Sequence, residues 1–95
     1  MDAIGEAGAI RGSTLLIDLF HRYPDGEASE LMRRLYWPCM HCAGALSEPL
    51  TMAARRHRNS PRAVLTAFRA MEAGALTEEL IAEAGRKLER VGHLR

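Results

Sequence analysis

The chain of 95 residues has few aromatic and few β-branched apolar side chains. Aromatic residues make up 5% of it, and valine occurs only at positions 64 and 91. Because strands are normally rich in such residues, their scarcity argues against a β-sheet. Leucine and alanine dominate the apolar set, and both favour helices. A chain of this length forms one domain with a modest core, which an oligomer interface, a metal or a disulfide would help to stabilise.

The sequence also lacks any apolar run approaching the ~20 residues that a membrane-spanning helix needs. Its start, MDAIGEAGAIRG, carries acids and glycines where a secretory signal would have an apolar segment. We therefore expect a cytoplasmic protein with no membrane association. Stable disulfides are rare in that compartment, so a close pair of cysteines there is more typical of redox chemistry or metal binding.

Helix signals divide the chain into a flexible N-terminal arm, residues 1–12, and a single helical domain, residues 13–95. Apolar residues recur at helical spacing throughout the second part. The helix-start signals are Ser13, Asp25, Pro38, Ser47, Ser60 followed by Pro61, and Thr77, and Gly74 is a helix-end signal. The pattern predicts an all-α fold, a small bundle or orthogonal array of five to six short helices, the last extending to Val91.

Both cysteines lie in the stretch YWPCMHC, residues 36–42. Pro38 is predicted to begin a helix, and Cys39 would then lie in its first turn, where the helix dipole lowers the pKa of a thiol. Cys39 would be the nucleophile and Cys42 the resolving thiol, while His41 would lower the thiol pKa further or carry a proton. The two aromatic residues before Pro38 are expected to anchor this corner in the core. The alternative is that both cysteines pack as small buried apolar side chains.

The stretch EASELMRRLYWPCMHC, residues 27–42, resembles the motif of the alkylhydroperoxidase D-like and carboxymuconolactone decarboxylase-like family. Redox-active members of that family have a Glu, eleven residues, a C-x-H-C or C-x-x-C pair, three residues and a His. The resemblance implies an all-α oligomeric fold and disulfide reductase or peroxidase-like activity, with Cys39 and Cys42 cycling and Glu27 as proton acceptor. The family's His falls on Leu46, which leaves the implied proton relay incomplete. Glu27 also has a simpler interpretation, as an acid favoured by the dipole at a helix start.

A metal site is the other use of the cysteine pair. Cys39, Cys42 and His57 would supply three of the four ligands of a tetrahedral zinc site. The four histidines are scattered, however, and no second ligand pair follows the first. No cofactor is therefore expected, and zinc is the alternative.

Charge is unevenly distributed along the chain. Residues 1–30 carry six acids and two bases, whereas residues 31–69 carry seven arginines and one acid. Within the basic part, Arg55, Arg56, Arg58 and Arg62 form a patch that suits a solvated surface or an acidic protein partner. The patch lacks interleaved aromatics, and the stretch TEELIAEA places acids where a helix-turn-helix would read DNA. Nucleic acid is therefore not expected as a ligand.

A non-enzymatic function is the alternative to redox chemistry. Short alanine-rich helices with a polarised charge pattern suit a protein-interaction or accessory module in which the cysteines are structural. The acidic residues 1–30 of one copy would also complement the basic middle of another. We therefore expect a homo-oligomer, a dimer or a trimer.

Overall fold

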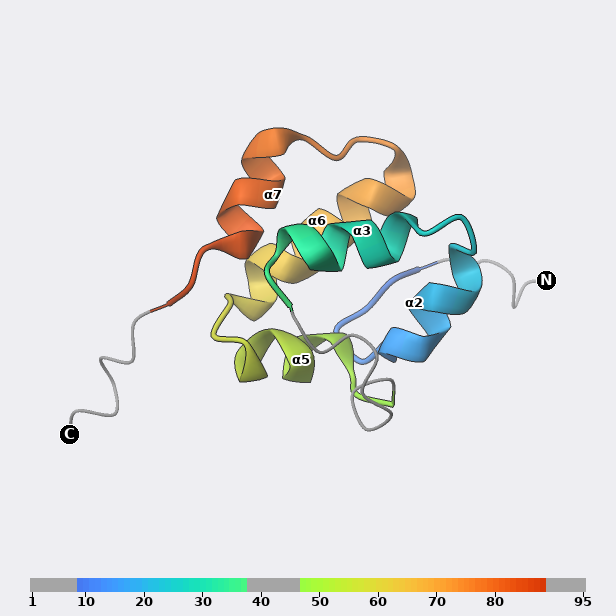
Figure 1. Cartoon of the computed structure of the whole chain (residues 1–95), viewed down its shortest axis with the longest axis horizontal. Helices are drawn as coiled ribbons and strands as arrows, with labels where there is room; N and C mark the ends of the chain where they lie inside the picture. The colour runs from blue at the N-terminus through green and yellow to red at the C-terminus, as the bar shows by residue number, and fades with distance from the viewer. Residues whose placement is uncertain (1–8, 38–46, 89–95) are drawn as a thin grey trace.

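The computed structural model describes residues 9–37 and 47–88. These residues form five α-helices and no strand, which confirms the predicted all-α fold (Figure 1). The helices are α2 (Leu16–Arg22), α3 (Glu27–Arg34), α5 (Leu50–Arg56), α6 (Pro61–Ala73) and α7 (Glu78–Gly85). No helix among the described residues is long and apolar enough to cross a membrane.

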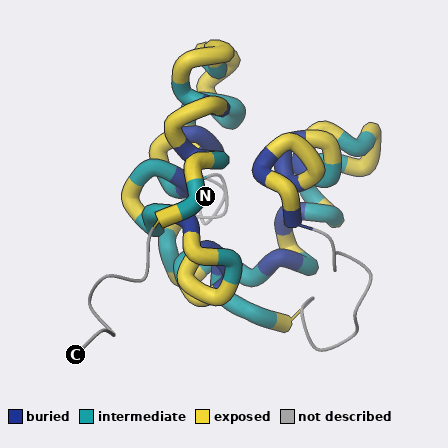
Figure 2. Tube along the Cα trace, turned by 60° about the vertical axis from the view of Figure 1, so that its left-hand side comes forward, coloured by how far each residue is buried: buried dark blue, intermediate teal, exposed yellow. Residues whose placement is uncertain are grey.

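The longest helix, α6, packs most extensively against α5 and α7, and α3 crosses in front of it in Figure 1. The buried residues lie on the sides of the helices that face one another (Figure 2). On α6 they follow helical spacing, with Val64, Ala67 and Phe68 directed inward as the sequence predicts. The largest fully buried apolar side chains are Phe68, Ile10, Leu19, Met32, Leu35, Leu50 and Val64.

Two of the predicted N-caps are confirmed, and both belong to the second half of the chain. The Ser60 hydroxyl accepts a hydrogen bond from Ala63 N at 3.2 Å, and Pro61 follows it as the first helical residue. The Thr77 hydroxyl accepts from Leu80 N at 3.2 Å. Gly74, in the left-handed region with φ 73°, ends α6 as predicted.

The other three predicted caps are wrong. Helix α2 begins after Leu15 instead of Ser13, α3 after Gly26 instead of Asp25, and α5 after Pro49 instead of Ser47. The reason at α2 and α5 is long-range backbone pairing. Leu16 N, the first of α2, donates to Glu48 O at 3.0 Å, and Leu50 N, the first of α5, donates to Thr14 O at 2.8 Å. Each helix start is therefore satisfied by the chain leading into the other, and no side-chain cap is needed.

Residues 9–12, which the sequence analysis assigned to the N-terminal arm, pack against the helical domain. Ile10 is fully buried, and its N–H donates to Glu72 Oε1 at 3.2 Å. Gly12 O accepts from both the backbone N–H and the hydroxyl of Thr51 at 3.0 Å. A Cβ at Gly12 would lie 2.8 Å from Thr51 Cγ2, so this close approach requires glycine.

Three helices end in the same hydrogen-bonded turn, the Schellman motif. In α6 the left-handed residue is Gly74, but in α3 it is Tyr36, with φ 64°, and in α5 it is Arg58, with φ 62°. After each of these residues the next N–H bonds back across the turn: Trp37 N donates to Met32 O at 3.2 Å, and Asn59 N donates to Ala54 O at 2.8 Å. Non-glycine residues in this conformation are strained and tend to mark functional positions.

Gly74 and Tyr36 both have a positive φ, but only Tyr36 is strained by it, so exchanges at the two positions should affect the free energy of unfolding differently. Gly74→Ala should lower the free energy of unfolding by about 1 kcal/mol, because alanine disfavours a positive φ. Tyr36→Gly should leave that free energy unchanged or raise it by up to about 1 kcal/mol, because Tyr36 is 73% exposed and glycine relieves the strain. Urea unfolding of both variants checks this, and a clear loss in Tyr36→Gly would mean that the exposed ring makes stabilising contacts.

Candidate functional site

The ends of α3 and α5 meet in a buried polar cluster that includes Trp37, two residues before Cys39 in the sequence. Trp37 and Asn59, the residues that follow the two strained positions, are 3% and 1% exposed. Trp37 Nε1 donates a hydrogen bond to Asn59 Oδ1 at 2.7 Å. The amide nitrogen of Asn59 donates to Ala84 O at 3.0 Å and to Arg86 O at 3.2 Å. One asparagine therefore links the ends of three helices.

Lys87, the one lysine in the chain, completes this cluster. Its Nζ donates to Leu35 O at 3.3 Å and to His57 O at 3.0 Å, the carbonyls that end α3 and α5. It also donates to Asn59 Oδ1 at 3.2 Å. An ammonium group is favoured there because the negative ends of two helix dipoles converge on it. Burial lowers the pKa of Lys87, and nearby Arg58 lowers it further.

His57 forms the outer side of the same cluster. Its imidazole is stacked on the Trp37 indole, with ring centroids 5.1 Å apart and an interplanar angle of 15°. Burial lowers the pKa of His57 below its usual value, and Arg56 and Lys87 lower it further. The imidazole is therefore neutral at pH 7. We call Trp37, His57, Asn59 and Lys87 the polar junction.

The lowered pKa of His57 predicts an acid-sensitive fold. The unfolded chain binds a proton at His57 more readily than the folded chain does, so the free energy of unfolding rises with pH through this range. The loss begins as the pH falls below about 6.5 and ends below the folded-state pKa. His57→Phe keeps the stack and removes the proton, so urea unfolding at pH 5 and pH 7.5 should show a smaller pH dependence in this variant. Equal pH dependence of the variant and the wild type would contradict the prediction.

The two aromatic residues expected to anchor this corner behave differently. Trp37 is buried as predicted, but Tyr36 is 73% exposed, so the prediction is wrong for Tyr36. The left-handed turn is the reason, because it reverses the chain after α3 and directs the two consecutive side chains to opposite sides. The predicted active-site residues Cys39, Cys42 and His41 lie outside the described residues, as does Leu46.

Glu27 is the predicted active-site residue that the structure does describe. It is the first residue of α3 and is exposed, at the helix end opposite the polar junction. With a rise of about 1.5 Å per residue, the length of α3 separates it from the turn at Tyr36 by more than about 10 Å. The structure therefore does not bring Glu27 together with Trp37 or His57. It does place Glu27 in the first turn of a helix, where the dipole favours an acid.

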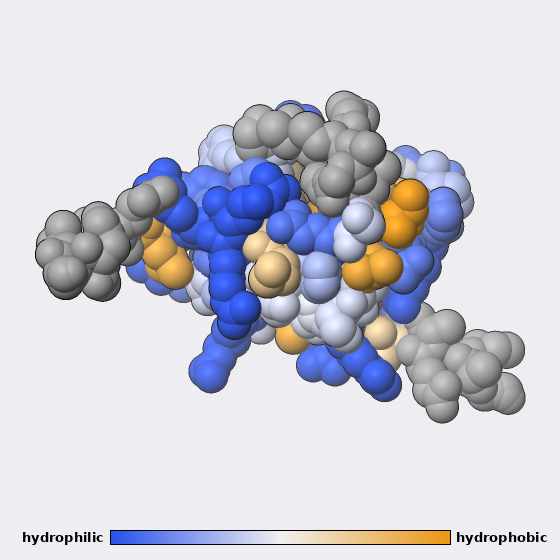
Figure 3. Space-filling view, turned by 90° about the horizontal axis from the view of Figure 1, so that it is seen from below, coloured by the Kyte–Doolittle hydropathy of each residue, from blue (hydrophilic) through white to orange (hydrophobic). Residues whose placement is uncertain are grey.

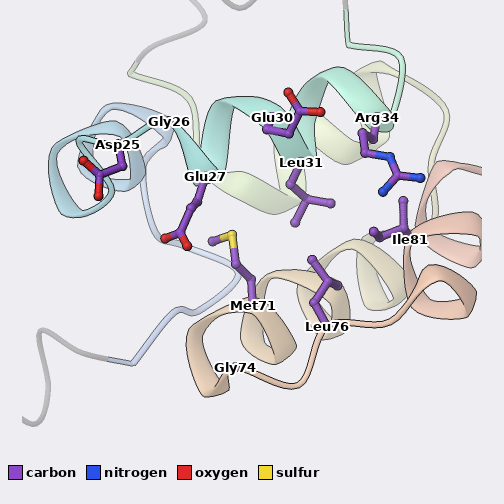
Figure 4. Close-up of a pocket in the computed structure, with 10 residues that line it drawn as sticks. All are labelled: Asp25, Gly26, Glu27, Glu30, Leu31, Arg34, Met71, Gly74, Leu76 and Ile81. Atoms are coloured by element: carbon purple, nitrogen blue, oxygen red, sulfur yellow. The ribbon is translucent and has the colours of Figure 1, made fainter.

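Glu27 lies at the edge of a groove between α3 and the α6–α7 turn, with a volume of about 500 Å³ (Figure 4). The side chains that form its floor are apolar: Leu31, Met71, Leu76 and Ile81. At one end, Arg34 of α3 makes a two-bond ion pair with Glu78 of α7, at 3.0 and 2.6 Å. This Arg34 guanidinium lowers the pKa of Glu78. At the other end lie Asp25 and Glu27, and Glu30 lies on α3 between the two ends (Figure 4).

The predicted basic patch lies around the break between α5 and α6. Arg55, Arg56, Arg58 and Arg62 are all exposed, but they differ in their pairing. Arg56 binds both oxygens of Glu48, at 2.8–3.1 Å, which removes it from an open cationic surface. Seen from the α5 side, the surface is largely hydrophilic, with only scattered apolar side chains (Figure 3).

No group of three His, Cys, Asp or Glu side chains among residues 9–37 and 47–88 could hold a metal ion. His57, the third ligand of the alternative zinc site, is stacked on Trp37, and the other two, Cys39 and Cys42, lie outside the described residues. Two of the four junction residues, Asn59 and Lys87, were not predicted from the sequence. The one available signal was a single lysine in a chain whose other cationic side chains are arginines.

Comparison of the chain with protein-family models, with curated proteins and with solved structures finds no match. The resemblance to the alkylhydroperoxidase D-like family therefore stays a prediction from the motif.

Proposed function

We propose that the protein is a small helical thiol redox protein that uses Cys39 and Cys42. The observation that supports this most directly is the polar junction, which fixes the chain at Trp37, two residues before Cys39. A cysteine pair is most useful in exchange when the backbone that presents it is held. The neutral imidazole of His57 lies beside Trp37 and can accept a proton at pH 7.

The reaction proposed is reduction of a disulfide in a partner protein. The Cys39 thiolate attacks one sulfur of that disulfide, and the other sulfur leaves as a thiolate. Cys42 then attacks Cys39 in the mixed disulfide, which forms the Cys39–Cys42 disulfide and releases the second sulfur. Two electrons pass to the partner, and the protons of the two cysteine thiols end on its two sulfurs. A dithiol reductant returns the pair to the reduced state.

Alkylation kinetics and trapping test this function. The rate of Cys39 alkylation against pH should give a thiol pKa well below about 8.5, the usual value. Cys42→Ser should accumulate a mixed disulfide with an oxidised model substrate such as insulin, and Cys39→Ser should not. Two thiols that react only after unfolding, or insulin reduction equal to that of a variant lacking both cysteines, would overturn the proposal.

A second candidate is a helical interaction module with structural cysteines, which the apolar groove favours. The predicted homo-oligomer and the predicted acidic partner of the arginine patch belong to this candidate. The variant lacking both cysteines separates the two functions, because an interaction module would keep its binding while a redox protein would lose its activity.

A further inference from the structure

The groove beside α3 has the form of a docking site for side chains. Of the four residues that form its apolar floor, Leu31 and Ile81 are 2% and 8% exposed, and Met71 and Leu76 are half-buried. In Figure 4 these four side chains point into the space between α3 and the α6–α7 turn. A volume of about 500 Å³ holds several side chains of a bound segment, and apolar contact would supply its affinity.

The charge around the groove defines what can enter it. Among the described residues that line it, the one cation is Arg34, which is engaged by Glu78. Glu30 is engaged by Arg33. Asp25 and Glu27 have no cationic partner among the described residues. The carboxylates of Asp25 and Glu27 therefore give this end of the groove a negative charge.

We propose that the groove binds a short cationic segment of a partner protein. One or two apolar side chains of the segment occupy the floor, and its Lys or Arg side chains pair with Asp25 and Glu27. An acidic segment or a nucleic acid is disfavoured because its charge would meet these carboxylates. The proposal is independent of the redox function, and it gives the interaction-module candidate a defined partner chemistry.

Fluorescence polarisation with two labelled peptides tests the proposal on the full chain in its reduced form. The peptides share leucine positions, and one carries arginine where the other carries glutamate. The arginine peptide should bind with an affinity that falls as salt is raised, and the glutamate peptide should not bind. Asp25→Asn combined with Glu27→Gln should weaken binding about five-fold. Asp18→Asn combined with Glu79→Gln, two exposed acids that do not line the groove, should leave it unchanged.

The same experiment distinguishes other outcomes. Leu76→Gln makes the apolar floor polar and should weaken peptide binding, and circular dichroism checks that this variant is folded. If it is not folded, the Asp25→Asn and Glu27→Gln double variant still tests the proposal. Equal binding of both peptides, or no effect of the Asp25 and Glu27 exchanges, would overturn the proposal. If the wild-type chain is a dimer that dissociates when Asp25 and Glu27 are exchanged, the groove binds a second copy of this chain, and the proposal is overturned. A variant with both cysteines changed to serine should bind the arginine peptide as the wild type does, which shows that binding does not depend on thiol chemistry.

Discussion

Asn59→Ala is expected to lower the free energy of unfolding by about 3–5 kcal/mol. The exchange removes the acceptor of the buried Trp37 Nε1–H and one acceptor of Lys87. It also removes the donor to the carbonyls of Ala84 and Arg86. Each buried polar group left without a partner costs about 1–3 kcal/mol, and Asn59 is 1% exposed, so water does not replace its bonds freely.

Urea unfolding measures this loss, and two further variants define its origin. Thr66→Ala, at an exposed position on α6, should change stability by no more than about 0.5 kcal/mol. Trp37→Phe removes the indole donor, so a double-mutant cycle with Asn59→Ala should show a coupling of about 1 kcal/mol or more. A loss below about 1 kcal/mol for Asn59→Ala would mean that the polar junction does not stabilise the meeting of the three helix ends.

Phe68→Ala is expected to cost about 3–5 kcal/mol, through lost burial and the cavity that remains. Phe68 is fully buried and is the largest fully buried side chain among the described residues. It lies on α6, the helix that packs against both α5 and α7, so a cavity there loosens both contacts. Total stability for a chain of this length is about 5–14 kcal/mol, so the variant approaches the unfolding limit at 37 °C.

Thermal unfolding followed by circular dichroism tests this expectation. Phe20→Ala is the matched control, because it removes the same side chain from a half-buried position on α2 and should cost clearly less. Phe68→Leu fills most of the cavity and should retain much of the stability. Equal effects of Phe68→Ala and Phe20→Ala would contradict the central position assigned to α6.

The parts of the fold that the sequence predicts correctly depend on local interactions. The Ser60 and Thr77 side chains each bond to the backbone N–H three residues further along the chain. The N–H of Gly74 bonds back to carbonyls of its own helix, α6. Leu15 and Pro49 differ, because they are paired with each other across 34 positions of sequence. Such pairing leaves no local signal, so the starts of α2 and α5 were displaced in the prediction.

The last helix was predicted to extend to Val91, but α7 ends at Gly85. Lys87 pairs with Asn59, and Leu88 N donates to Arg58 O at 2.7 Å, which draws the chain out of the helix. Leu88, which a helix continued to Val91 at this apolar spacing would direct toward the core, is 38% exposed for this reason. The apolar residues of 80–91 keep helical spacing beyond Gly85, but the contacts with the segment after α5 that end the helix leave no signal in that spacing.

The candidate site shows the same division. An aromatic anchor before the cysteines could be predicted from Trp37, since a large side chain at a chain corner is usually buried. The contacts of Trp37 with Asn59, and of Asn59 with Lys87, could not be predicted, because Asn59 and Lys87 lie 22 and 50 positions after Trp37 in the chain. The groove at Asp25 and Glu27 also depends on where α7 lies relative to α3. A local motif identified Glu27, while its surroundings come from distant segments.

The position of Lys87 has a consequence for how the protein forms during synthesis. The carbonyls of Leu35 and His57 are made long before the ammonium group that bonds to them. While the ribosome still holds residue 87, the ends of α3 and α5 lack this bond, and Asn59 lacks its partners at Ala84 and Arg86. The polar junction can therefore close only after nearly the whole described chain has emerged, which makes its closure a late step in the folding of these helices.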